Sequence, residues 1–68
     1  MVWILTDYTN GTQELVACAF TYEQIKKALN ILLDLDKMVQ EHHKYRILFV
    51  KENENGYPNY FKEEHYES

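Results

Sequence analysis

The sequence of 68 residues predicts a single α+β domain, in which one long helix covers one face of an antiparallel sheet. Three observations predict this fold. Two apolar runs flank an Asn-Gly turn, a long amphipathic stretch follows a helix cap, and a last apolar run precedes the C-terminal tail. We expect the order ββαβ, or ββαββ if the tail adds a fourth strand.

The first two strands are predicted at residues 2–8 and 14–20, on either side of Asn10 and Gly11. Asn-Gly between apolar runs is the strongest short signal for a hairpin, because both residues accept positive φ. Even-numbered residues of the first strand share one face and odd-numbered residues share the other, and both faces carry large apolar groups. This pattern is typical of a central strand covered at least partly on both sides.

The helix is predicted to start after Thr21, which forms a capping box with Gln24, and to run through residues 22–43. Its apolar residues form a stripe at helical spacing. They are Ile25, Ala28, Leu29, Leu32, Leu33, Leu35 and Val39. Ile31 and Met38 widen the apolar arc to about 220°, roughly twice the width of a minimal core-facing stripe.

The third strand is predicted at residues 45–51. A right-handed crossover through the helix places it antiparallel beside the first strand, which gives the sheet order 2-1-3. The tail, residues 52–68, contains Pro58, which fits only an edge strand or a bulge because it cannot donate a ladder hydrogen bond. As an edge strand, the tail extends the order to 2-1-3-4. In either case we expect residues 1–51 to form the compact core of the single domain.

Charge is distributed unevenly along the chain. Residues 1–51 hold six acids and six bases, whereas residues 52–68 hold five glutamates against Lys62 and carry the whole net charge of -4. Nucleic-acid binding needs clustered Lys and Arg, which the sequence lacks. We therefore expect a protein partner, with a basic surface permitted, and no nucleic acid.

Size and composition exclude other classes of protein. A chain this short buries only about 60% of its unfolded surface, so a catalytic cleft is hard to form and we expect no enzyme. No apolar run approaches the roughly 18 residues of a membrane span, and the N-terminus lacks the basic region of a signal peptide. The single cysteine, Cys18, cannot form an internal disulfide. We expect a cytoplasmic protein without membrane association, in which Cys18 is a small core residue.

The tail combines aromatic and acidic residues, a chemistry suited to a basic protein surface. Its candidate partner-binding residues are Tyr57, Tyr60, Phe61, Glu63, Glu64 and Tyr66. The alternative is an edge strand that places Tyr57 and Phe61 in the core, with a frayed acidic end.

Ile31, Leu35 and Met38 form a ridge at helical spacing on the side of the apolar stripe. Only part of so wide an arc can press on one sheet. Either the tail or a long side chain covers the ridge, or the ridge is the interface of a homodimer or a second contact with a partner.

Asp36 lies within the apolar stripe, where an unpaired carboxylate costs several kcal/mol. Water at the helix end could solvate it, it could pair with Lys44, Arg46 or His43, or it could be a functional acid. Trp3, Asp36 and His43 are the candidate residues of a small-molecule or nucleotide site at a dimer seam. An acid–base pair of Asp36 and His43 is the least favoured alternative.

No cofactor is implied, and the three histidines lack the spacing of a metal site. His42 and His43 are adjacent, so within a helix their side chains point about 100° apart.

Residues 2–50, and in particular "VWILTDYTNGTQELVACAFTYEQIKKALNILL", resemble the small ββαβ proteins of bacteriophage and prophage genomes. The resemblance rests on an N-terminal hairpin followed by a Glu/Lys-rich helix with a Thr or Ser cap. It implies a non-enzymatic accessory protein that inhibits or modulates a bacterial host protein, in host takeover or counter-defence. It assigns no functional residue, and the tail departs from the pattern.

Overall fold

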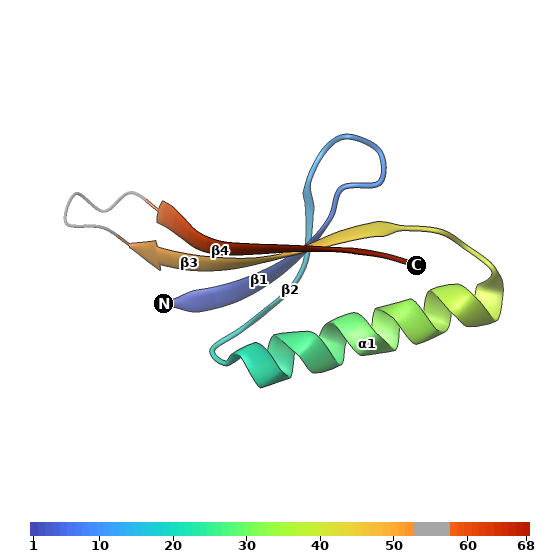
Figure 1. Cartoon of the computed structure of the whole chain (residues 1–68), viewed down its shortest axis with the longest axis horizontal. Coiled ribbons are helices and arrows are strands. Elements are labelled where there is room, and N and C mark those ends of the chain that lie inside the picture. The colour runs from blue at the N-terminus through green and yellow to red at the C-terminus, as the bar shows by residue number, and fades with distance from the viewer. Residues whose placement is uncertain (53–57) are drawn as a thin grey trace.

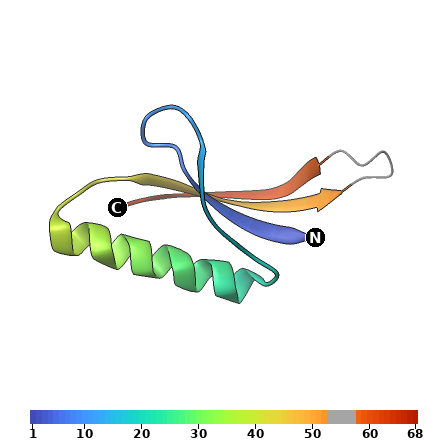
Figure 2. The same cartoon turned by 180° about the vertical axis from the view of Figure 1, so that it is seen from behind.

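A computed structural model describes residues 1–52 and 58–68, with the backbone alone for Glu52 and for residues 58–62. Its elements are β1 (Val2–Asp7), β2 (Glu14–Ala19), α1 (Tyr22–Val39), β3 (Lys44–Glu52) and β4 (Pro58–Glu67). The strands form one antiparallel sheet in the order β2-β1-β3-β4, and α1 lies on one side of it (Figures 1 and 2). The predicted α+β fold is confirmed, including the fourth strand formed by the tail.

The core lies between α1 and the odd-numbered face of β1. Leu5 from β1, Ile25 and Leu29 from α1, and Ile47 from β3 are fully buried there. Ile25 and Leu29 are four residues apart and so lie on one face of the helix, and alternate strand residues point to one face of the sheet, so these four side chains meet between the two layers. Among the described elements, α1 alone packs on the sheet, yet Thr6 and Leu48 on the opposite face are also buried, so both sides of β1 are at least partly covered, as expected.

The helix begins as predicted and ends earlier than predicted. The Thr21 hydroxyl accepts a hydrogen bond from the backbone N–H of Gln24, as expected for an N-cap. Gln40 adopts a left-handed conformation with φ of 59°, and its N–H bonds to the carbonyl of Asp36. His42 and His43 therefore lie beyond the helix, in the segment that leads into β3.

Both edge strands contain a β-bulge. Leu5 pairs with Ala17 and Thr6 pairs with Leu15, so Val16 is the extra residue in β2. In the same way Phe61 is the extra residue in β4. Bulges bend and twist an edge strand, which makes it a poor template for pairing with a strand of another chain.

Cys18 is exposed, so its predicted place in the core is wrong. It pairs with Ile4, on the face of the sheet that α1 does not cover. The apolar run of β2 hid this placement, because a continuous apolar run does not reveal which face of a strand is buried.

Candidate interaction surfaces

The predicted tail residues lie on a regular edge strand and divide between its two faces. Glu64 and Tyr66 lie on the side of α1, and Glu63 lies on the open side beside His65. Tyr60 and Phe61 lie in β4, in the part of the strand for which only the backbone is described. Tyr57 lies outside the described residues.

The α1 side of β4 is tied to the first turns of the helix. The Tyr22 hydroxyl donates to Glu64 at 2.7 Å, Tyr66 also donates to Glu64, and the Lys26 ammonium donates to the Tyr66 hydroxyl at 2.7 Å. The hydrogen bond to Glu64 raises the pKa of Tyr22 to about 12, and its bond to Glu64 also raises the pKa of Tyr66. These side chains hold β4 to α1, a structural role that the sequence did not predict for Glu64 and Tyr66.

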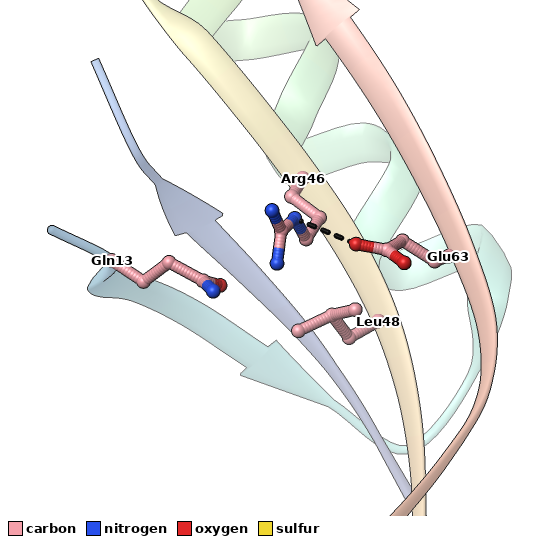
Figure 3. A pocket seen from close by; sticks show the side chains of 4 residues that line it. All are labelled: Gln13, Arg46, Leu48 and Glu63. Carbon is pink, nitrogen blue, oxygen red and sulfur yellow. Dashed lines mark ion pairs between the residues drawn. The ribbon is translucent and has the colours of Figure 1, made fainter. Parts of the chain in front are cut away.

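The open side of β4 carries a charged cluster. Arg46 Nε lies 2.9 Å from Glu63 Oε1, and His65 Nε2 lies 3.4 Å from the same oxygen. The Arg46 Nε–H is not aligned on that oxygen, so the contact is an ion pair rather than a hydrogen bond. Arg46, Glu63, Leu48 and Gln13 line a shallow pocket of about 180 Å³, shown in Figure 3. The pair leaves little net charge on the pocket.

Asp36 is paired, and it lies at the end of α1 beside the start of β3. It is 4% exposed, and its Oδ2 accepts a hydrogen bond of 2.7 Å from the Tyr45 hydroxyl. His43 Nδ1 lies 2.9 Å from Oδ1, in an ionic contact without hydrogen-bond alignment. Of the alternatives that the sequence left open, the structure shows pairing with His43.

The protonation of this cluster follows from its contacts. Burial by itself would raise the pKa of the Asp36 carboxyl, but the hydrogen bonds of Tyr45 and Ser68 and the contact with His43 hold it below its ordinary value. The contact with Asp36 raises the pKa of His43 against the effect of burial. Burial, and then the hydrogen bond to Asp36, raise the pKa of Tyr45. At neutral pH the carboxylate is ionised and the phenol is neutral.

Within the described residues, Asp36, Glu41 and His43 form a group whose ligand atoms lie within 4.8 Å of one another. His43 Nδ1 is already in contact with Asp36, and Tyr45 occupies the second carboxylate oxygen. A metal ion bound by all three residues would have to displace these contacts. The expectation of no metal site stays a prediction.

Trp3 does not join Asp36 and His43. Its ring lies 4.9 Å from that of Tyr22 and 4.5 Å from that of Phe49, measured between centroids. Tyr22 begins α1, whereas Asp36 lies 14 residues later, about 21 Å along the helix. The three predicted ligand residues therefore form two separate groups within one chain.

The predicted ridge is exposed. Ile31 is 67% exposed, Met38 is 80% exposed, and Leu35 and Val39 are about half exposed. We call these four residues the α1 strip. Beside it, a groove of about 240 Å³ runs between α1 and β2, lined by Val16, Ala17, Ala28, Ile31 and Leu32. The tail pairs with β3, at the opposite edge of the sheet from β2, so it does not cover the α1 strip.

Sequence reasoning missed the partners of the functional candidates. The Tyr45 hydroxyl donates to Asp36 and the Tyr22 hydroxyl donates to Glu64. Both tyrosines occupy positions of the apolar pattern, so the sequence favoured packing over hydrogen bonding for them. A signal was present for Tyr45, because it alternates with Ile47 and Phe49 on one face of β3. A buried tyrosine needs a hydrogen-bond partner, and Asp36 is the buried acid closest to it in sequence.

The sequence matches no family model, and no curated protein or solved structure is significantly similar to the chain. The described part of the chain contains no helix that is both long and apolar enough to cross a lipid bilayer.

Proposed function

We propose that this chain is a small protein-binding module without a catalytic role. The α1 strip carries the proposal, because it leaves four large apolar side chains between about half and four-fifths exposed along one side of the only helix of the described chain. Exposed apolar patches of this kind mark interaction surfaces, since water contact with them is unfavourable.

The open side of β4 supplies a second surface, suited to a partner with a basic patch. Glu63 and Glu67 are exposed on this edge strand, which belongs to the acidic end of the chain. Binding there would use side chains, because the bulge at Phe61 disturbs the strand edge. The resemblance to small bacteriophage proteins extends the proposal to an inhibitor or modulator of a bacterial host protein.

Capture of a bacterial protein on the immobilised full-length chain tests the second surface. Glu63→Lys, alone and with Tyr60→Ala, is compared with Glu14→Lys, which makes the same charge change on the opposite edge of the sheet. We expect the captured protein to be lost with the Glu63 variants and retained with Glu14→Lys. Circular dichroism establishes that each variant is folded.

Equal capture by the wild type and both Glu63 variants would remove β4 from the interface. Failure of the wild type to retain any protein would contradict the host-inhibitor proposal.

A further inference from the structure

The α1 strip and its groove form one apolar surface on the β2 side of the molecule. Ile31 belongs to both, and the small side chains of Ala17 and Ala28 leave the groove open. The helix is about 27 Å long for its 18 residues. A lengthwise contact along it has the order of area that a small interface needs, about 500 Å² from each partner.

The bulge in β2 bears on how this surface can be used. Val16 interrupts the ladder at the centre of the edge strand, so a partner gains little from adding a strand there. Side-chain packing against the helix and the groove is the remaining mode. An amphipathic helix suits such a groove, because its apolar residues recur every three to four positions.

The charge distribution favours a second copy of this chain as the source of that helix. Residues 1–51, which include α1 and β2, have no net charge, and the acidic excess lies in residues 52–68. These end in β4, at the opposite edge of the sheet from β2. Two copies that meet through α1 therefore hold their acidic strands at the outer edges of the pair, which limits repulsion between them.

The helix is also complementary to itself when two copies run antiparallel. Ile31 lies next to the midpoint of Tyr22–Val39, so a two-fold axis at Ile31 overlaps the helices along their whole length. That axis places Lys27 of one copy beside Asp34 of the other, twice by symmetry. It also places the large Leu35 of each copy near the small Ala28 of the other, at the mouth of the groove.

We propose that the α1 strip is a self-association surface, on which a second copy of this chain packs its α1 antiparallel about a two-fold axis near Ile31. The proposal rests on the proposed function in that it names the partner of one of the two binding surfaces. It leaves β4 of each copy free for another protein.

Sedimentation equilibrium of the full-length chain, from about 5 to 500 µM, tests the proposal. We expect a monomer–dimer equilibrium that Ile31→Lys weakens by about 30-fold or more, as for a residue at the centre of an interface. Asn30→Lys is the matched control, since it makes the same charge change one residue earlier on a different side of the helix. Ile31 is largely exposed, so circular dichroism should show the same fold for both variants.

A charge reversal tests the antiparallel arrangement separately. Lys27→Glu or Asp34→Lys alone replaces two attractive contacts by two repulsive ones and should weaken the dimer by about three- to tenfold. The double variant should return the dissociation constant to within about twofold of the wild type. Ile31→Cys in a Cys18→Ser background should form a disulfide across the axis, whereas Asn30→Cys in the same background should not.

A wild-type chain that stays monomeric, or a dimer unaffected by Ile31→Lys, would overturn the proposal. Failure of the double charge variant to recover association would also overturn it, because the arrangement requires that pair. A monomeric chain that captures another protein through Ile31 would overturn the assignment to a second copy and leave the proposed function standing. A dimer that captures no host protein would support the self-association surface and contradict the proposal of a host-protein inhibitor.

Discussion

Asp36 is the residue whose position is hardest to explain by hydrophobic burial. It occupies a stripe position on α1 and remains ionised there because the Tyr45 hydroxyl donates a hydrogen bond to one of its oxygens and His43 lies in ionic contact with the other. The sequence reveals such a residue as a conflict between polarity and position, since an unpaired buried carboxylate is costly. Among the partners predicted from the sequence, His43 was one of three, and Tyr45 was not among them. Pairing of this kind is a structural explanation for both residues and needs no catalytic one.

The cluster predicts how stability depends on pH. The folded-state pKa of His43 is above its ordinary 6.5, so its contribution is full below that value and is lost as pH rises through the folded-state pKa. The folded-state pKa of Asp36 is below its ordinary 3.8, so its contribution is present above that value and is lost as pH falls further. We therefore expect this cluster to stabilise the chain most between these two ordinary values. Urea unfolding across the pH range measures it.

His43→Gln is the variant that isolates the histidine. It should reduce the fall in unfolding free energy as pH rises through the folded-state pKa of His43. The control is His42→Gln, which changes the exposed neighbouring residue and should leave that fall unchanged. A pKa of His43 at or below 6.5 in an NMR titration of the folded chain would contradict this account.

The elements differ in how clearly their ends are encoded. The start of α1 follows from Thr21, whose hydroxyl bonds to a backbone N–H that the helix itself leaves free. The end of α1 has no glycine to mark it, and polar residues continue past Val39 without a break. Gln40 takes the left-handed position that glycine usually occupies, so the backbone accepts strain to turn toward β3.

Replacement of Gln40 should show that strain. Gln40→Gly removes the side chain that disfavours positive φ and should raise the unfolding free energy by about 0.5–1 kcal/mol. Gln40→Val places a β-branched residue at the same φ and should lower it by about 1–2 kcal/mol. Urea unfolding of the two variants beside the wild type measures both changes. Equal stability of the two variants would mean that the position carries no strain.

At the scale of the whole molecule, β4 decides whether the tail is an appendage or part of the fold. It pairs with β3 along nearly its whole length, and Tyr66 packs against the core. Glu64 and Tyr66 also bond to α1. The tail is therefore a structural strand whose open side still carries exposed acids.

Truncation to residues 1–51 should consequently unfold the chain rather than remove a binding surface. The loss of β4 exposes the edge of β3 and takes away the cover of Tyr45 and Ile47, in a domain with few fully buried side chains. We expect no cooperative thermal transition by circular dichroism, whereas full-length Glu63→Lys melts cooperatively. A truncated chain with a sharp transition would show that residues 1–51 suffice for the fold.

The sequence by itself determined the α+β class, the hairpin and the helix start, because turn chemistry, capping and hydrophobic period act over short distances along the chain. It also determined the order 2-1-3 of the first three strands, because a crossover through a helix has a preferred hand. It also located the ridge of Ile31, Leu35 and Met38 from helical spacing alone. Only the tertiary structure decided that Trp3 lies apart from Asp36, that Cys18 is exposed, and that the tail leaves the ridge uncovered. These outcomes depend on which face of the sheet α1 covers and which edge β4 joins, and both are set by contacts between residues far apart in the sequence.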